Sequence, residues 1–306
     1  MKIRDILQKG EESLRFAGID EYKSDAFVLF EYVFGIDRTQ YFIKSLDEEE
    51  DSSKLDRYFE LINLRCLHKP VQYITNRQMF MGLEFYVDEN VLIPRFDTEI
   101  LVENVLDIIG KRYFDKSHSD KSYSDKYQSE KNHFGREISV LDMCTGSGCI
   151  AISIAKLADI KNITAVDISD GAIEVAKKNS KKNNVDINFV KSDLFDCLDG
   201  KVFDIIVSNP PYIRTEVVSS LMEEVRSFEP MMALDGTEDG LFFYRKITKE
   251  SVSHMNTGGY LAYEIGFDQG NDVKQILIDN GFIDVEIIKD LAGLDRVVIG
   301  RLAGNQ

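Results

Sequence analysis

The chain has 306 residues, enough for two domains, and 43% of them are hydrophobic, which is ordinary for a globular protein. It contains no run of about 18 apolar residues, and Met1–Asp5 does not start the apolar core of a signal peptide, so neither a transmembrane helix nor a signal peptide is expected. The net charge of −16 disfavours a long nucleic-acid duplex as a partner. We therefore expect a cytoplasmic protein that binds neither membranes nor, directly, nucleic acid.

The cysteines show no pattern that indicates a metal site. The four of them, Cys66, Cys144, Cys149 and Cys197, are scattered along the chain without metal-ligand spacing. Cytosolic thiols are the simplest interpretation, and no metal is expected.

Residues 1–75 carry the apolar spacing of amphipathic helices. A first stripe begins at Ile3, and a strongly apolar second helix covers residues 27–34. Ser53 can cap a third helix, which ends before Pro70. No glycine-rich or catalytic pattern occurs in this stretch. We predict a small helical bundle whose role is recognition rather than chemistry.

Residues 76–96 are predicted to link this bundle to a second domain. The stretch 79–93 is typical of a β-hairpin, with its turn expected at Asp88–Asn90. The second domain is expected to cover residues 97–306 and to begin with a helix over Asp97–Ile109.

A charged insert interrupts the second domain at about residues 111–137. An acidic residue followed by lysine recurs every five residues between positions 115 and 131. This period matches neither helix nor strand, and aliphatic side chains are nearly absent. We predict a solvated, mobile segment; an arm that contacts a partner is the alternative.

From residue 138 onward, strand-like apolar runs alternate with helical patterns. The runs cover residues 138–141, 163–166, 187–190, 203–208, 259–265, 285–288 and 297–300. Such alternation predicts an α/β fold with a mostly parallel, doubly wound sheet and helices on both faces. The last two runs lack an intervening helix, so we expect the last strand to pair antiparallel.

A glycine-rich loop, residues 142–148, follows the first of these strands. The spacing Gly146-x-Gly148-x-x-Ala151 fits a dinucleotide fingerprint only loosely. Asp142 at the strand end would repel a pyrophosphate and would favour a cationic ligand. S-adenosylmethionine carries an ammonium and a sulfonium group and no phosphate, so it suits this loop better than a dinucleotide.

Two further acids stand at the ends of the next two strands. Asp167 is placed to accept hydrogen bonds from both ribose hydroxyls of a nucleoside. Asp193 could accept from the adenine amino group, with Leu194 against the ring. Each aspartate alone could instead cap a helix or shape a turn. Together with Asp142, they favour a binding site for S-adenosylmethionine.

The most informative stretch is Asn209-Pro210-Pro211-Tyr212, directly after the apolar run 203–208. The prolines end the strand and form a rigid loop at its carboxyl end, where open α/β sheets bind ligands. The side-chain oxygen of Asn209 and the carbonyl of Pro210 can each accept an amino hydrogen, while Tyr212 can pack on a flat group. A neutral, planar substrate with an NH2 group is indicated; a plain proline-rich strand end is the alternative.

The whole chain resembles the release-factor glutamine methyltransferases, the HemK or PrmC type of protein-(glutamine-N5) methyltransferase. The matching stretches are residues 69–74, 93–99, 142–148, 165–167, 192–195, 207–213, 226–230, 258–260 with Glu264, and 290–301. Asn-Pro-Pro-Tyr is shared with methyltransferases of adenine and guanine amino groups, whereas Ile-Pro-Arg-x-Asp-Thr-Glu is more particular to this family. Cys144 stands where glycine is usual, Phe96 stands where proline is usual, and the insert is not a family feature.

The resemblance implies a Rossmann-like, class I S-adenosylmethionine-dependent methyltransferase domain and a helical domain that helps to hold a peptide-chain release factor. The implied reaction methylates the side-chain amide nitrogen of the glutamine in a Gly-Gly-Gln motif and leaves S-adenosyl-L-homocysteine. Asn209, Pro210 and Tyr212 are the implied catalytic residues, and with Pro211 they form the substrate site. The implied cofactor residues are Asp142, Cys144, Thr145, Gly146, Ser147, Gly148, Asp167, Asp193, Leu194 and Asn209.

Catalysis in such a site should rest on positioning, because an amide nitrogen is a poor nucleophile and a sulfonium is already a good methyl donor. Asn209 and Pro210 would hold the two N–H groups and direct the lone pair at the methyl. Two other functions stay open. One is an amino methyltransferase acting on adenine or guanine of DNA or ribosomal RNA, and the other is a non-catalytic module that binds the cofactor or a translation factor.

Overall fold

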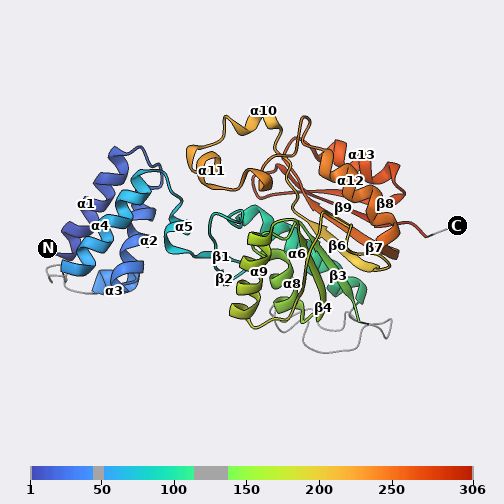
Figure 1. The fold of residues 1–306 in the computed structure, drawn as a ribbon, viewed down its shortest axis with the longest axis horizontal. Helices are drawn as coiled ribbons and strands as arrows, with labels where there is room; N and C mark the ends of the chain where they lie inside the picture. Colours follow the sequence, from blue (N-terminus) through green and yellow to red (C-terminus); the bar gives the residue numbers. More distant parts are fainter. Residues whose placement is uncertain (1, 44–51, 114–136, 305–306) are drawn as a thin grey trace. The chain divides into compact units, whose positions relative to one another are not determined.

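The structure, a computed structural model, describes residues 2–43, 52–113 and 137–304 (Figure 1). It separates into two compact units. Unit 1 comprises Met1–Arg77 and Met222–Phe228, and unit 2 comprises Gln78–Leu221 and Glu229–Gln306. A short segment from the second half of the sequence is therefore part of unit 1.

Unit 1 is helical, as predicted for residues 1–75. Its helices are α1 (Ile3–Phe16), α2 (Tyr22–Phe34), α3 (Arg38–Ile43), α4 (Ser52–Cys66), α5 (Val71–Thr75) and α11 (Glu223–Phe228). Along α1, buried residues recur every three or four positions and pack in one cluster with those of α2 and α4. Gly10 permits this close packing, because a Cβ there would lie 2.0 Å from the hydroxyl oxygen of Tyr58.

A buried ion pair joins three helices of unit 1. Arg65 of α4 donates from Nε to Oδ2 of Asp25 of α2 at 2.7 Å, and its Nη2 lies 2.6 Å from Oε2 of Glu224 of α11. The side chains of Arg65 and Asp25 are only 6% and 9% exposed. Each buried charge in this cluster therefore has an opposite charge beside it.

Unit 2 is built on a seven-stranded sheet in the order β5-β4-β3-β6-β7-β9-β8. The strands are β3 (Ser139–Met143), β4 (Asn162–Asp167), β5 (Asn188–Lys191), β6 (Phe203–Ser208), β7 (Met255–Glu264), β8 (Phe282–Lys289) and β9 (Asp295–Leu302). Neighbours from β5 to β7 pair in parallel, whereas β9 is antiparallel to both β7 and β8. This confirms the predicted mostly parallel sheet with antiparallel pairing of the last strand.

Helices cover both faces of the sheet (Figure 1). They are α6 (Phe96–Tyr113), α8 (Cys149–Ala158), α9 (Asp170–Asn183), α12 (Phe242–Ser251) and α13 (Gly270–Asp279). Unit 2 also has the short helix α10 (Thr215–Val218) and the 3-10 helices η1 (Met231–Ala233) and η2 (Val252–His254). Val140 and Ile205 face the layer that contains α6 and α8, and the next residues, Leu141 and Ile206, face the layer that contains α12 and α13. Because both faces are covered, β3 and β6 are buried throughout.

The hairpin lies earlier than the sequence analysis predicted. β1 (Gln78–Phe80) pairs antiparallel with β2 (Leu83–Phe85) through a turn at Met81 and Gly82. These two residues have φ of 50° and 72°, which suits a two-residue hairpin turn. The prediction of the hairpin turn at Asp88–Asn90 is therefore wrong. Asp88 does accept a hydrogen bond from the Asn90 N–H at 3.0 Å, but in the loop after the hairpin.

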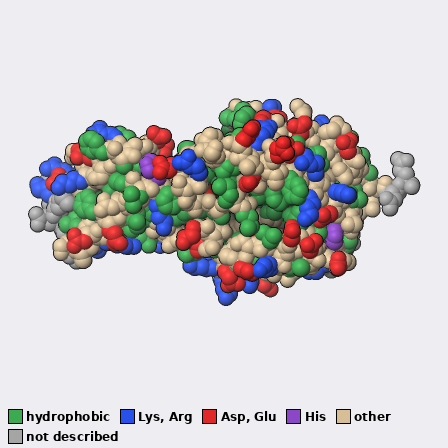
Figure 2. Space-filling model, turned by 45° about the horizontal axis from the view of Figure 1, so that its top comes forward, with side chains coloured by type: hydrophobic (Ala, Val, Ile, Leu, Met, Phe, Trp, Pro, Cys, Tyr) green, Lys and Arg blue, Asp and Glu red, His purple; other side chains and the backbone are tan. Residues whose placement is uncertain are grey.

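The region around the predicted insert is described only in part. Helix α6 extends to Tyr113 rather than Ile109, and residues 114–136 lie outside the described residues, so the predicted mobile segment is not described. On the face seen in Figure 2, acidic and basic side chains are interspersed. Across the described residues, each helix is too short or too polar to cross a membrane.

Candidate active site

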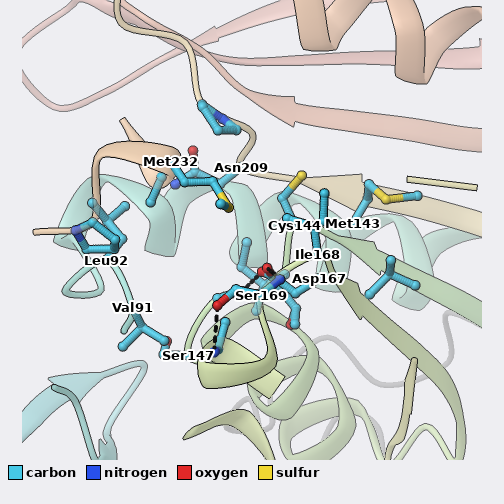
Figure 3. A pocket seen from close by; sticks show the side chains of 18 of the residues that line it. Val91, Leu92, Met143, Cys144, Ser147, Asp167, Ile168, Ser169, Asn209 and Met232 are labelled. Carbon is cyan, nitrogen blue, oxygen red and sulfur yellow. Dashed lines mark hydrogen bonds between the residues drawn. The ribbon is translucent and has the colours of Figure 1, made fainter. Parts of the chain in front are cut away.

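A cavity of about 480 Å³ lies in unit 2, at the carboxyl ends of β3, β4, β5 and β6 (Figure 3). The loop before α6, the 3-10 helix η1 and the first turns of α12 complete its wall. This is the switch point of the sheet, where doubly wound folds bind their ligands. The volume is within the usual range for cofactor sites, about 300–1,000 Å³.

The loop after β3 follows a left-handed path beside the cavity. Cys144, Gly146 and Gly148 have φ of 62°, 53° and 80°. A Cβ on Gly148 would also lie 3.0 Å from a side-chain carbon of Ile152 and 3.1 Å from Cβ of Ala176, so glycine allows α8 to pack closely against α9. Cys144 adopts the same backbone conformation with a side chain, at a position that glycine would occupy with less strain.

Asp142 lies below this loop rather than on the cavity wall. Its side chain is fully buried, and its Oδ2 accepts hydrogen bonds from the Thr145 hydroxyl at 2.6 Å and from the Ala151 N–H at 3.2 Å. Its Oδ1 has no hydrogen-bond partner among the described protein atoms. Burial raises the pKa of Asp142 to about 7, and the bond from Thr145 opposes this shift. The carboxyl group therefore braces the loop and does not reach the cavity surface, where the predicted contact with a cationic ligand would need it.

Asp167 ends β4 and lines the cavity (Figure 3). Its Oδ2 accepts from the Gly146 N–H at 2.8 Å, and its Oδ1 accepts from the Ser169 N–H at 2.9 Å. Burial raises the pKa of Asp167, and these two backbone bonds oppose the shift. Each carboxylate oxygen keeps a further lone pair that can accept a ligand hydroxyl. This position suits the predicted role as acceptor for ribose hydroxyls.

The end of β5 supplies another part of the wall. Leu194 is buried and has φ of 50°, whereas Asp193 is exposed. Lys246 of α12 also lines the cavity, and its Nζ lies 3.4 Å from Oδ1 of Asp193. The acid that was predicted to meet the adenine amino group is therefore accompanied by a cation that sequence analysis did not single out.

The Asn-Pro-Pro-Tyr segment is divided between the wall and the layer behind it. Asn209 and Pro211 line the cavity, whereas Pro210 and Tyr212 do not. The Tyr212 hydroxyl donates to Oε1 of Glu264 at 3.4 Å, and the Tyr212 carbonyl accepts from Nε2 of Gln269 at 3.0 Å. Tyr212 therefore supports the loop from behind. The sequence analysis had expected its ring to pack on the substrate, but the ring does not line the cavity.

The structure brings most of the predicted cofactor residues together. Those that line the cavity are Cys144, Thr145, Gly146, Ser147, Asp167, Asp193, Leu194 and Asn209, while Asp142 and Gly148 lie outside its wall. Within the described residues, no group of three or more His, Cys, Asp or Glu side chains could hold a metal ion.

Known proteins match both parts of this sequence. A family model described as the PrmC N-terminal domain matches residues 5–75, and one described as the methyltransferase small domain matches residues 129–226. The release factor glutamine methyltransferase of Clostridium acetobutylicum is 41% identical over 99% of this chain and 100% of its own length. Those of Clostridium botulinum and Geobacter sulfurreducens are 40% and 34% identical, each over 98% of this chain, and over 99% and 96% of their own lengths.

The chain belongs to the release factor glutamine methyltransferase family. Membership confirms the predicted family and class of enzyme, an S-adenosylmethionine-dependent methyltransferase. The cavity suits this cofactor, because Asp167 offers acceptors for the ribose while Ile168 and Leu194 offer apolar surface for a flat base.

In this member of the family, sequence analysis missed the segment before α6. Residues 89–92, Pro94 and Arg95 of this segment line the cavity, as does Thr98 in the first turn of α6. Arg95 forms an ion pair with the buried Glu229. The Ile-Pro-Arg-x-Asp-Thr-Glu stretch was the available signal, since it marks the family. Its place at the cavity depends on the packing of α6 against the sheet, which the sequence pattern does not reveal.

Proposed function

We propose that this protein transfers the methyl group of S-adenosyl-L-methionine to the side-chain amide nitrogen (N5) of the glutamine in the Gly-Gly-Gln motif of peptide-chain release factors. The observation that carries the proposal is the position of Asn209: it lines the same cavity as Asp167, on a proline-stiffened loop, in a chain whose relatives are release factor glutamine methyltransferases. A reaction on release factors belongs to the cytoplasm, where translation takes place.

Within the cavity, the cofactor would lie across the ends of β3, β4 and β5. Asp167 would accept from the ribose hydroxyls, and Leu194 would pack on the adenine ring beside Asp193. The backbone from Cys144 to Ser147 would border the methionine part. When bound, the cofactor supplies an electrophilic methyl group on a positively charged sulfur.

The chain's own residues would then orient the substrate amide. Oδ1 of Asn209, on the cavity wall, would accept one of its two N–H groups. The carbonyl of Pro210, the next residue of the loop but not part of the wall, would accept the other when the amide enters the loop, which leaves the nitrogen lone pair directed at the methyl group. Pro211 would confine one side of the flat amide. The amide nitrogen would form its new bond to the methyl carbon as that carbon leaves sulfur, whose electron pair would stay behind, and the proton displaced from nitrogen would pass to solvent. The same acceptors stabilise the positive charge that develops on nitrogen.

Unit 1 would supply recognition of the intact factor. A pocket for one glutamine side chain is too small to select one protein among many, so selectivity needs contacts remote from the reacting atoms. Phe16 and Phe42 of unit 1 are 84% and 83% exposed and are available for such contacts. Phe16→Ser and Phe42→Ser should raise KM for the whole factor and leave KM for a short Gly-Gly-Gln peptide unchanged. Equal changes for both substrates would contradict a recognition role.

Mass spectrometry of a release factor incubated with the enzyme and S-adenosylmethionine tests the main proposal. The peptide that contains Gly-Gly-Gln should gain the mass of one methylene group, and fragmentation should place it on the glutamine side chain. A factor with Gly-Gly-Ala should gain nothing. Parallel reactions with DNA and ribosomal RNA test the alternative amino methyltransferase activity. Methyl transfer to nucleic acid but not to the factor would overturn the proposal.

A further inference from the structure

One part of the cavity wall is a segment without regular structure. Residues 86–92 follow the hairpin strand β2 and form neither strand nor helix. Residues 89–92 line the cavity together with Ser147 and Asp167 (Figure 3). We call residues 86–92 the wall segment. Because it has no ladder of backbone hydrogen bonds along its length, its position depends on the side chains that contact it.

The side chain of Asn179 binds the start of the wall segment. Asn179 lies on α9 and is buried. Its Oδ1 accepts from the Tyr86 N–H at 2.6 Å, and its Nδ2 donates to the Tyr86 carbonyl at 2.9 Å. One amide side chain therefore pairs with both backbone groups of Tyr86, as a residue of a neighbouring antiparallel strand would. This pairing fixes both the position and the direction of the chain where the wall segment begins.

The same side chain also binds the glycine-rich loop. Nδ2 of Asn179 donates to the Ser147 carbonyl at 2.9 Å. A primary amide has two donor hydrogens, and both are used here, one for Tyr86 and one for Ser147. Among side chains of this size only an amide fits, because two carbonyl oxygens need donors and one N–H needs an acceptor. Asn179 therefore connects two parts of the cavity wall that are far apart in the sequence.

A second contact with α9 lies further along the wall segment. Asn90 packs on Gly171, in the first turn of α9: a Cβ on Gly171 would lie 2.5 Å from Oδ1 of Asn90 and 3.0 Å from its Cβ. The wall segment is therefore held against α9 at two points, Tyr86 and Asn90.

We propose that Asn179 is a positioning residue for S-adenosylmethionine, which holds the wall segment and the glycine-rich loop in the arrangement that binds the cofactor. A wall that is in place before binding spares the ligand the cost of ordering it. If the wall segment were in place for only a fraction of the time, the dissociation constant would rise by the inverse of that fraction. The inference concerns the cofactor cavity and does not depend on which amide the protein methylates.

Asn179→Asp tests these hydrogen bonds at nearly constant shape. The substitution removes both donor hydrogens and places a carboxylate against two carbonyl oxygens. We expect the dissociation constant of S-adenosyl-L-homocysteine, measured by calorimetry, to rise about tenfold or more, as it would if the wall segment were in place for about a tenth of the time.

Asn183→Asp is the matched control on the same helix. Nδ2 of Asn183 also donates to two carbonyls, that of Glu84 at 3.2 Å and that of Asn179 at 3.0 Å. The control therefore loses the same two donors, but these hold β2 and α9 rather than the cavity wall. Its dissociation constant should stay within about threefold of wild type. Equal increases in the two variants would overturn the inference.

Hydrogen exchange read by mass spectrometry reports on the wall segment directly. Without cofactor, the peptide that contains residues 86–92 should exchange faster in Asn179→Asp than in wild type or Asn183→Asp. Unchanged exchange of this peptide would contradict the positioning role, and so would faster exchange with unaltered affinity. Neither measurement needs a methyl acceptor, so a protein that methylates no release factor would refute the proposed function and leave this inference standing.

Gly171→Ala displaces the wall segment without a change at Asn179. Alanine favours the helix, but its methyl group would lie where Asn90 now packs. We expect the dissociation constant to rise about threefold or more while the thermal unfolding temperature does not fall. In a protein that carries Asn90→Gly, the same substitution should have little effect, because the side chain that it meets is absent. A rise that persisted in that background would contradict the inference. If Asn179→Asp does not fold, an unchanged dissociation constant in Gly171→Ala would overturn it.

Discussion

One buried acid of unit 1 and two buried acids of unit 2 are bonded differently. In unit 1, Asp25 is paired with Arg65 at 2.7 Å. In unit 2, Asp142 and Glu264 are 0% and 1% exposed, and each has one carboxylate oxygen without a hydrogen-bond partner among the described protein atoms. Burial raises the pKa of both to about 7. A buried carboxyl group that is not fully bonded costs stability, so packing alone does not explain why unit 2 contains two of them.

The positions of these acids in unit 2 account for the difference. Asp142 braces the loop that borders the cavity, and Glu264 stands behind Asn209. Ionisable groups that lower stability and have a shifted pKa are concentrated at functional sites, where the positions of side chains determine the reaction. In unit 1, by contrast, the buried charges join α2, α4 and α11. Of these three acids, the one paired with an arginine joins helices, and the two that are incompletely bonded lie below the cavity loop and behind Asn209. Glu229, which is buried and paired with the cavity residue Arg95, shows that pairing also occurs at the site.

The largest expected effect is on the stability of unit 1. Arg65→Met should leave Asp25 buried without its cation and lower the free energy of unfolding by about 3–5 kcal/mol. Arg57→Met on the same helix is the matched control, because the Arg57–Glu60 pair is exposed and contributes about 0–1 kcal/mol. Hydrogen exchange read by mass spectrometry on α2 and α4 measures the change within unit 1. Equal protection from hydrogen exchange in the two variants would show that the buried ion pair does not stabilise unit 1.

The next effect concerns the reaction. Asn209→Ala removes an acceptor for the reacting amide, and we expect kcat to fall by about 10²–10³ with a much smaller change in cofactor affinity. Asn63→Ala, at an exposed position of α4, is the control and should leave kcat unchanged. Activity of the Asn209 variant within threefold of wild type would remove the basis for the proposed mechanism.

Most of the architecture could be predicted because the central strands of unit 2 contain short apolar runs, several of which are followed within a few residues by an acidic or amide side chain. Asp167, Asp193 and Asn209 were found in this way, and the parallel sheet brings all three to one cavity. Contacts between segments that are distant in the sequence could not be predicted from such patterns. Thr98 meets Asn209 because α6 packs against the sheet over β7 and β9, and Lys246 reaches Asp193 from α12.

The local path of the backbone was the other feature that the sequence patterns did not predict. Asp142 was expected at the ligand, but the left-handed path of the loop turns its carboxyl group inwards, where Thr145 and Ala151 bind it. The hairpin turn was misplaced because Met81 adopts a positive φ that side chains other than glycine, asparagine and aspartate seldom take. Both errors come from backbone conformations that residue type alone does not reveal.

A smaller effect is expected at the cofactor. Asp167→Ala should weaken binding of S-adenosylmethionine by about 1.5–3 kcal/mol, because two ribose hydroxyls lose a charged acceptor. Asp186→Ala, an exposed aspartate before β5, serves as the control. Isothermal calorimetry gives both affinities. Unchanged binding in the Asp167 variant would contradict the assignment of the ribose to the end of β4.

The smallest expected effect is the pH dependence of stability in unit 2. The folded pKa of Glu264 is about 7, above its usual value of 4.5, so the folded state binds this proton more tightly than the unfolded chain does. The stability that the proton contributes is fully present below about pH 4.5 and is lost as the pH rises towards 7. Arg296 and Asp97 also face Glu264, and they act in opposite directions on its pKa.

Glu264→Gln should therefore flatten the fall in the free energy of unfolding between about pH 5 and pH 7, by an amount on the order of 1 kcal/mol. Urea unfolding at several pH values measures this, with Glu238→Gln, at an exposed position, as the control. Other groups that titrate in this range affect wild type and variants alike, so the difference between the curves isolates Glu264. If the curves of wild type and Glu264→Gln run parallel, this carboxyl group is already ionised throughout the range, and its burial is offset by the hydroxyls of Thr98 and Tyr212. The contrast with the paired Asp25 of unit 1 would then be one of hydrogen bonding rather than of charge.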